Sequence, residues 1–299
     1  MTLRRDWSDL PAAVRDAVGH QCGGIRAVTP ISVGVNSAVA CALDTAGDGA
    51  VFLKGYQEPA RNEWMFRNEL AAASAGAPGP QFLWHLEVDR WHLFAWEHLP
   101  GRHADLAPGS PDLDLIAAAL AELAEIPPLE VGTGFAPEAR RWERLQPWKH
   151  LAAAPPEHLD PWIRGNLDRF AAAEYDALQI LHGNRLVHTD LHGYNILIDD
   201  QHRRGHLIDW AWARPAAPWV DAELLAFRLV ADGHTSAKAD QWRLDHLPHP
   251  GVALDIRRSF AVQMLGTWLH LARRDPSREL LSVSAEHALS WAKYLHDME

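Results

Sequence analysis

Alternating apolar and polar positions run through most of the first hundred residues and predict a mostly β region. The runs ISVGVNSAVACALD and GAVFLKGY, within residues 25–55, are separated by the turn-like segment TAGDG, as expected for neighbouring strands. Two further apolar runs, QFLWHLEV and WHLFAWEHL, are separated only by Asp89 and Arg90, which predicts a β-hairpin. Residues 60–75 place bulky apolar residues among alanines and predict one helix.

Beyond residue 100 the apolar spacing changes to that of helices. The expected helices cover residues 112–126, 138–151, 161–182, 220–232, 235–246, 254–274 and 277–297, and short strands are expected near 195–199 and 206–209. The segment LPGRHADLAPGSPD is rich in proline and glycine and predicts the crossing between two regions. We therefore expect an α+β fold with a small β-rich lobe at 1–98 and a larger, mostly helical lobe at 99–299.

Composition narrows the classes of protein that this pattern allows. The chain has 299 residues, 47% hydrophobic and 22% charged, which is ordinary for a soluble globular protein. A formal net charge of −11 argues against a general nucleic-acid binder, because phosphate contacts favour basic proteins. The two cysteines, Cys22 and Cys41, form no C-x-x-C motif, so we expect reduced thiols rather than a disulfide.

No apolar run reaches about 18 residues, the length of a membrane-spanning helix, and no apolar segment typical of a signal peptide follows the N-terminus. We therefore expect a cytoplasmic protein, monomeric or homodimeric, with neither membrane nor nucleic acid as a partner.

The segment LVHTDLHGYNILID at 186–199, followed by HLIDWAW at 206–212, carries the most informative polar residues. His188, Asp190 and Asn195 are expected in a loop, and Asp209 ends the next short strand. In phosphoryl transfer, such an aspartate accepts the proton of the attacking hydroxyl. An asparagine five positions later and a second aspartate can share Mg²⁺, which prefers oxygen ligands.

The stretches HTDLHGYN and LIDW resemble the aminoglycoside phosphotransferase family, a branch of the protein-kinase-like fold. That family carries H-x-D-x-x-x-x-N and then an apolar strand that ends in I-D-W or I-D-F. The resemblance implies that Asp190 is the catalytic base, that Asn195 and Asp209 hold Mg²⁺, and that His188 supports the loop. It also implies ATP or GTP as the phosphoryl donor.

Two other interpretations of the same segment are weaker. His188, Asp190 and His192 could be ligands of a hydrolytic zinc or iron site, but this interpretation leaves Asn195 and Asp209 without a role. Alternatively, Asp190 and Asn195 are turn residues and Asp209 is a surface acid, an arrangement that is common for each residue singly but not for the whole pattern in this order.

The small lobe offers one candidate for the phosphate-contacting lysine of kinase chemistry. Lys54, inside the apolar run AVFLKGY, is the only lysine before residue 149 in a chain that otherwise uses arginine. Such a lysine needs an acidic partner, and Glu63 and Glu69 lie on the following expected helix. The family resemblance favours Glu69, because FRNELAAASAG matches the family's R-E-A-x-x-L pattern.

The same resemblance assigns nucleotide contacts to two short segments. The loop SVGVNSAV would cover the phosphates, with fewer glycines than protein kinases have, and FAWEHLPGR would supply the backbone that reads adenine. The residues assigned in this way are Ser32, Gly34, Asn36, Ser37, Glu97, His98 and Leu99.

The acceptor is expected to be a small molecule with a hydroxyl group, bound by residues within 210–299. Asp221, Glu223 and Trp212 are the candidates, because carboxylates suit a polyamine and aromatic faces stack on cations or sugars. Family members often read D-P-x-x-D-L-A here, whereas this chain has Leu225 at the second acid. We therefore expect an aminoglycoside-like or other antibiotic acceptor, with a metabolic kinase (sugar, choline-like or amino alcohol) or a nucleotide-binding protein without turnover as alternatives.

Overall fold

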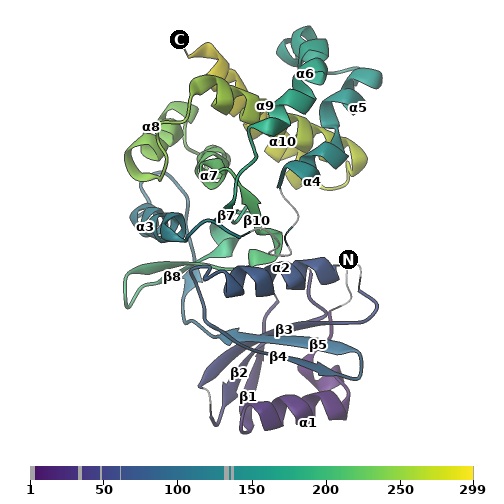
Figure 1. The fold of residues 1–299 in the computed structure, drawn as a ribbon, viewed down its shortest axis with the longest axis vertical. Coiled ribbons are helices and arrows are strands. Elements are labelled where there is room, and N and C mark those ends of the chain that lie inside the picture. The colour runs from purple at the N-terminus through teal and green to yellow at the C-terminus, as the bar shows by residue number, and fades with distance from the viewer. Residues whose placement is uncertain are drawn as a thin grey trace.

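The computed structural model describes residues 4–32, 36–47, 49–60, 62–130, 135 and 138–298. A β-rich region and a helical region stack along its longest axis (Figure 1). This arrangement confirms the expected α+β class with a β-rich first third and a mostly helical remainder. The proposed lobe boundary after residue 98 falls between two strands, β5 and β6, and remains a prediction.

One antiparallel sheet of five strands, in the order β1-β2-β3-β5-β4, forms the β-rich region. The expected hairpin is confirmed: Asp89 and Arg90 are the two residues between β4 and β5, and both have positive φ angles, 46° and 67°. Such angles match the right-handed twist of the flanking strands. The strands are β1 Ile25–Pro30, β2 Val39–Thr45, β3 Ala50–Gln57, β4 Phe82–Val88 and β5 Trp91–Glu97.

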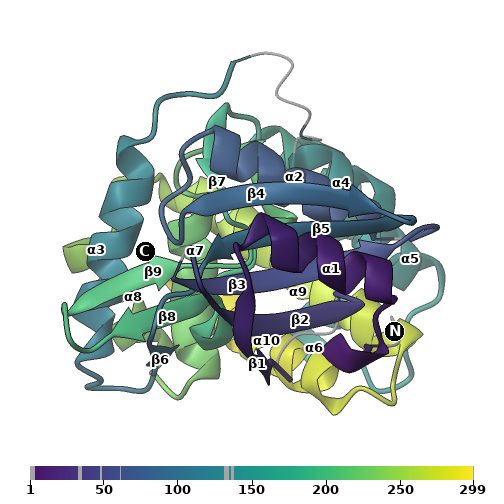
Figure 2. The same ribbon diagram turned by 90° about the horizontal axis from the view of Figure 1, so that it is seen from below.

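A helix covers each face of this sheet, as the view from below shows (Figure 2). Helix α1 (Ala12–Gln21) places Val14 and Val18 against apolar residues of β2, β3 and β5. Helix α2 (Glu63–Ser74) packs Phe66 against the aromatic side chains of the opposite face and separates the sheet from the helical region. The alternation of side chains along β3 and β5 therefore feeds two separate apolar layers.

The helical region contains two small sheets, β6-β8-β9 and β7-β10, among its helices. The expected helix at 138–151 is wrong in one respect: it is divided at Gln146, which has a φ of 39°, before Pro147. Strands β6, β7 and β10 are too short to leave an alternating pattern in the sequence, and they were not expected. The elements are β6 Arg102–His103, α3 Asp112–Glu125, α4 Glu138–Leu145, α5 Pro147–Ala153, α6 Pro161–Gln179, β7 Arg185–Val187, β8 Ile196–Asp199, β9 Arg204–Leu207, β10 Arg214–Ala216, α7 Val220–Ala231, α8 Ser236–His246, α9 Leu254–Arg274 and α10 Glu279–Asp297.

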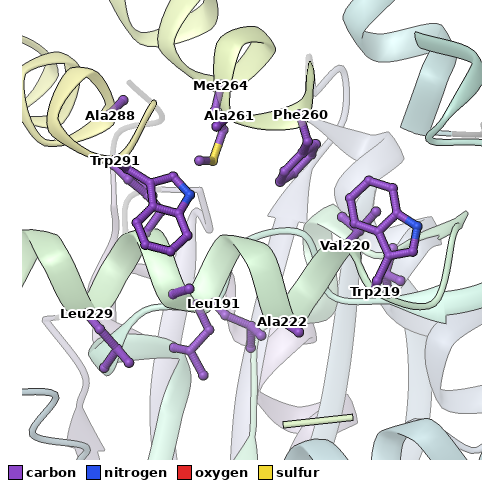
Figure 3. Packing of buried hydrophobic residues seen from close by; sticks show 14 of the residues in the cluster. Leu191, Trp219, Val220, Ala222, Leu229, Phe260, Ala261, Met264, Ala288 and Trp291 are labelled. Atoms are coloured by element: carbon purple, nitrogen blue, oxygen red, sulfur yellow. The ribbon is translucent and has the colours of Figure 1, made fainter. Parts of the chain in front are cut away.

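Large aromatic side chains fill the core of the helical region. Trp219, at the start of α7, packs edge-on against Phe260 of α9, and Trp291 of α10 points into the same core (Figure 3). Both tryptophans lie with Leu229 of α7 in one continuous apolar cluster. Packing between helices therefore accounts for these tryptophans without any contact to a ligand.

Two expectations about the chain's environment can be compared with the structure. Cys22 and Cys41 are both buried, and no disulfide joins them. Within the described residues, none of the helices combines the length and the apolar character that crossing a membrane requires.

Candidate active site

Three charged side chains from separate elements meet where the sheet faces the helical region. Lys54 of β3 places its Nζ 2.5 Å from an Oε atom of Glu69 on α2 and 3.2 Å from an Oδ atom of Asp209, which lies two residues after the β8–β9 hairpin. Lys54 is 7% exposed, and its ammonium group also lies over the Trp96 ring, 5.1 Å from the centroid. The lysine and the glutamate chosen from the sequence are therefore an ion pair, whereas the fallback Glu63 pairs with Arg67.

Burial and charge act in opposite directions on these groups. Burial lowers the pKa of Lys54, but the carboxylates of Asp209 and Glu69 outweigh this effect, and the net pKa is raised. Burial raises the pKa of Glu69 to about 7 despite the nearby ammonium group. For Asp209, burial raises the pKa, but the charge and hydrogen bond of Lys54 prevail and lower it. Lys54 therefore stays charged at neutral pH, and Glu69 is the member of the group closest to titration.

The loop between β7 and β8 holds Asp190 and Asn195 in contact. The Asn195 amide nitrogen donates to the Asp190 carbonyl at 2.8 Å, so its Oδ1 is left to face another ligand. The Asn195 carbonyl accepts from the Ile208 N–H at 2.9 Å, which ties this loop to the segment between β9, which ends at Leu207, and Asp209. His188 donates from Nε2 to the Ile208 carbonyl at 2.9 Å and accepts the Asp190 N–H at Nδ1. His188 is therefore a support of the loop, as expected.

Asp221 of α7 was expected to bind the acceptor, but the structure places it behind the loop. Its carboxylate accepts the N–H groups of His188 and Thr189 at 2.6 and 2.9 Å, and it is 3% exposed. Thr189 has a φ of 61°, an unfavourable angle for a β-branched residue. A strained residue of this kind needs support from its surroundings, and Asp221 supplies part of it. Asp221 is a brace for Asp190 rather than a contact for the acceptor.

The other two acceptor candidates also have different roles from those expected. Glu223 is fully buried, and its carboxylate binds Arg257 at 2.7 Å and Arg243 at 3.2 Å. Asp240 binds the same two arginines; we call these four residues the arginine cluster. Trp212 packs edge-on against Trp64 of α2 at 4.9 Å, and its carbonyl accepts the Thr189 hydroxyl. Its ring is therefore part of the contact between the two regions.

Arg228 of α7 is a charged neighbour of Asp190 that no sequence pattern indicated. One of its guanidinium nitrogens lies 3.9 Å from Asp190 Oδ1, and the guanidinium carbon lies 5.3 Å from the centroid of the Trp268 ring. Burial lowers the pKa of Arg228, against the opposing effect of Asp190. His192 Nε2 lies 3.8 Å from the other Asp190 oxygen. No local motif marks Arg228; only its spacing of seven residues, two helical turns, from Asp221 on α7 could have suggested it.

The segments assigned to the nucleotide are only partly described. Gly34 lies outside the described residues, Ser32 and Asn36 are exposed, and Ser37 is buried. Asn62, before α2, donates a hydrogen bond to the Asn36 carbonyl and so ties the loop to that helix. At the end of β5, the N–H groups of Glu97 and His98 donate to the Gln81 and Ala50 carbonyls.

Leu99 is the remaining residue of the segment expected to read adenine. Within the part of the chain that the structure describes, its N–H makes no hydrogen bond. Because the N–H groups of Glu97 and His98 are occupied, Leu99 is the one of these three residues whose N–H is left for a base edge.

Comparison with known protein families decides the class of this arrangement. The profile of the phosphotransferase enzyme family (APH) matches residues 27–255, which include Lys54, Glu69, Asp190, Asn195 and Asp209. The chain belongs to the phosphotransferase enzyme family. The match confirms the resemblance drawn from HTDLHGYN and LIDW and the expected class of enzyme. Among curated protein sequences, none matches this phosphotransferase.

Solved structures share the fold of this phosphotransferase at low sequence identity. The aminoglycoside phosphotransferase APH(4)-Ia, crystallised with ADP and hygromycin B, is 14% identical with a TM-score of 0.65, over 96% of this chain and 100% of that one. Spectinomycin phosphotransferase APH(9)-Ia, crystallised with ADP and spectinomycin, is 11% identical with a TM-score of 0.56, over 90% and 89% of the two chains. The choline kinase LicA from Streptococcus pneumoniae is 13% identical with a TM-score of 0.60, over 95% and 98%.

Proposed function

We propose that this phosphotransferase moves the γ-phosphoryl group of ATP to a hydroxyl group of a small molecule. The proposal rests on two sets of contacts that meet where the sheet faces the helical region. Lys54 is held between Glu69 and Asp209, and Asn195 is bonded to Asp190 in the loop that adjoins Asp209 through Ile208. GTP in place of ATP is an alternative donor with the same chemistry.

Each of these residues has a separate task in the proposed reaction. Lys54 contacts the α- and β-phosphates, as a compact cation can. Asp209 and the free Oδ1 of Asn195 would hold Mg²⁺, a fit of hard oxygen donors to a hard ion. When bound, Mg²⁺ neutralises charge on the phosphates. Asp190, whose side chain is 33% exposed, receives the proton of the acceptor hydroxyl as the new O–P bond forms and the bond to the β-phosphate oxygen breaks.

Arg228 adds a positive charge on the acceptor side of Asp190. Its position 3.9 Å from the carboxylate suits a group that orients Asp190 and offsets the negative charge of the phosphoryl group in transfer. Its stacking on the Trp268 ring holds the guanidinium plane in place.

The acceptor class rests on the charges beyond Arg228. Asp232, which directly follows α7, and Asp105 are exposed, and the Asp105 carboxylate lies close enough to act on Asp232. Burial, together with Asp105, raises the pKa of Asp232. A pair of carboxylates beside the proposed hydroxyl position suits an acceptor that carries amino groups, such as an aminoglycoside-like antibiotic. The structural likeness to LicA makes a choline-like or amino alcohol the second candidate.

The test is a screen for acceptor-dependent ADP release over aminoglycosides, other antibiotics, sugars, choline-like alcohols and amino alcohols. One class should release ADP stoichiometrically with a phosphorylated product. Asp190→Asn should lower that rate by about 10²- to 10⁴-fold, the usual contribution of a general base. An unchanged rate in Asp190→Asn would refute the assigned base.

Nucleotide binding is tested separately from turnover by thermal stability. ATP with Mg²⁺ should raise the melting temperature of the wild type, and Asp209→Ala should remove this shift. Asp199→Ala, in an aspartate of β8 paired with His202, is the control and should keep it. A nucleotide shift without ADP release for any acceptor would instead favour the non-catalytic alternative.

A further inference from the structure

The β4–β5 hairpin carries a cluster of three metal-ligating side chains that phosphoryl transfer does not use. Glu87 of β4 pairs directly with His92 of β5, and His85 lies two residues before Glu87 on the same strand. Side chains alternate across a sheet, so all three share one face. This face is the one that also carries Lys54, Tyr56 and Phe94.

The donor atoms of this cluster, which we call the hairpin triad (His85, Glu87 and His92), lie at distances that suit one small ion. His85 Nε2 and His92 Nδ1 are 3.4 Å apart. Glu87 Oε1 is 3.4 Å from His92 Nδ1 and 3.7 Å from His85 Nε2. Two donors bound tetrahedrally at 2.0–2.2 Å from Zn²⁺ stand about 3.3–3.6 Å apart. The three atoms therefore form one face of a coordination shell and leave an open side for water.

Hydrogen bonding alone satisfies this cluster poorly. A neutral His92 turns one ring lone pair toward a carboxylate in either tautomer: Nδ1 toward Glu87 at 3.4 Å, or Nε2 toward Glu58 at 3.0 Å. A metal ion accepts electron pairs, so one ion can bind His85 Nε2, Glu87 Oε1 and His92 Nδ1 at the same time.

Neighbouring groups hold both imidazoles in this orientation. The His85 ring stacks on Phe94 with 4.4 Å between centroids, and the His92 ring stacks on Tyr56 with 4.7 Å, both within 8° of parallel. Stacked rings lose little further freedom when they bind.

The other nitrogen of His92 completes a second layer of support. His92 Nε2 lies 3.0 Å from Glu58 Oε1, the carboxylate–histidine arrangement that orients metal ligands. Two hydrogen bonds between Arg90 and the backbone of Glu58 fix that residue against the hairpin turn.

We propose that His85, Glu87 and His92 bind one divalent transition-metal ion of the Zn²⁺ type, with Glu58 orienting His92. Two imidazoles and one carboxylate suit Zn²⁺ and exclude Mg²⁺ and Ca²⁺ as the preferred ions. The bound ion clamps β4 to β5 beyond the strand residues that pair with Lys54, and it is separate from the proposed magnesium ligands. This assignment does not depend on the identity of the acceptor.

The test is competition for Zn²⁺ between the metal-free full chain and a chromophoric chelator, in millimolar Mg²⁺. The wild type should hold one tight equivalent of Zn²⁺. His85→Gln and Glu87→Gln should each lower its affinity by more than about 100-fold, and Glu58→Gln by about 10-fold, since losses of outer ligands typically cost 10- to 100-fold. Co²⁺ added to the wild type should show the absorption of a four- or five-coordinate site, which Zn²⁺ abolishes.

Two controls keep this proposal falsifiable in a chain with 18 histidines. His202→Gln removes an imidazole that pairs with one carboxylate, Asp199, but with no second imidazole, and it should keep the tight equivalent. The Glu87 side chain is 65% exposed, so Glu87→Gln tests the site without disturbing the core. The proposal is overturned if the wild type binds no Zn²⁺ against the chelator, if Mg²⁺ displaces it, or if the tight equivalent survives in both His85→Gln and Glu87→Gln.

Discussion

Two groups of buried charge in this phosphotransferase differ in what surrounds them. In the arginine cluster, Glu223, Asp240, Arg243 and Arg257 bind one another, and their side chains are at most 4% exposed. At the junction, Lys54 and Glu69 are also buried, with side chains 9% and 6% exposed, but Asp209 is 42% exposed and Asp190 33%. The first group is enclosed by helices α7, α8, α9 and α10, and we call it the sealed group. The second, which we call the open group, leaves carboxylate oxygens accessible to a ligand. Ion pairs of similar composition therefore serve helix packing in one place and the proposed phosphate chemistry in the other.

The largest expected effect of a substitution lies in the sealed group. Arg257→Met should destabilise the protein by about 3–5 kcal/mol, because it leaves Glu223 and Asp240 buried with one partner fewer. Urea denaturation measures this change. Phosphoryl transfer at a temperature where the variant is folded should keep its rate, because the cluster does not contact Asp190.

A matched surface pair gives the control for this experiment. Arg26 and Asp44 form an ion pair with side chains 62% and 57% exposed, and Arg26→Met should cost less than about 1 kcal/mol. Equal losses in the two variants would remove the distinction between a sealed and an exposed pair. A strong fall in the transfer rate of folded Arg257→Met would make the cluster part of the reaction.

A substitution beside the open group should change the rate of phosphoryl transfer rather than the stability of the protein. Arg228→Gln should lower kcat by about 10²- to 10³-fold, the usual effect of removing one donor that stabilises developing charge. Steady-state kinetics with the acceptor found in the screen measures it. The control is Arg169→Gln, because Arg169 also stacks on an aromatic ring, Phe170, but belongs to α6 and contacts none of the proposed site residues. Unchanged kcat in Arg228→Gln would remove Arg228 from the proposed reaction.

The residues of the open group were largely predictable because their signals are local. Asp190 and Asn195 share one loop, Asp209 follows the next hairpin, and Lys54 stands alone as a lysine in its strand. The roles of Asp221 and Glu223 were not predictable, since both are acids on one helix and only the packing of α7 decides what each one faces. Arg228 was missed for the same reason. Sequence spacing places residues along an element, but contacts between distant elements determine which ones meet.

One hydrogen bond connects the two regions beside the open group, and its loss should have a smaller effect. Asn68 of α2, 7% exposed, donates to the carbonyl of Ala211 at 2.9 Å, two residues after Asp209. Asn68→Ala should destabilise the protein by about 1–3 kcal/mol, the cost of an unsatisfied buried carbonyl. It should also raise the KM for ATP, because α2 and Asp209 lose a common support.

A control substitution of an asparagine that bonds within its own helix separates the loss of stability from the change in the KM for ATP. Asn166 of α6 donates to the Trp162 carbonyl at 2.8 Å within its own helix. Asn166→Ala should leave the KM for ATP unchanged. The same KM shift in both variants would show that Asn68 acts through general stability and not through the position of Asp209.

The smallest expected effect is a dependence of activity and stability on pH, and it arises from Glu69. Burial raises the pKa of Glu69 to about 7 from an ordinary value of 4.5. As pH falls through about 7, Glu69 gains a proton and no longer balances Lys54, so kcat/KM should fall by up to tenfold for each further pH unit. Stability responds in the opposite direction: because the folded pKa lies above the unfolded one, ionisation of Glu69 costs stability as pH rises between 4.5 and 7.

The pH profile of two glutamate variants on the same helix tests this assignment. Glu69→Gln should have lower activity and should lose the fall in kcat/KM centred near pH 7, because glutamine does not titrate. Glu63→Gln, which disturbs only the exposed partner of Arg67, should keep the wild-type profile. If Glu69→Gln retains the fall in kcat/KM at low pH, another group controls that fall. The exposed carboxylates of Asp190 and Asp209, rather than the Lys54–Glu69 pair, then set the pH response. If the fall in kcat/KM disappears while stability below pH 7 changes little, the Lys54–Glu69 pair serves the reaction at the expense of stability. In this respect it differs from the arginine cluster.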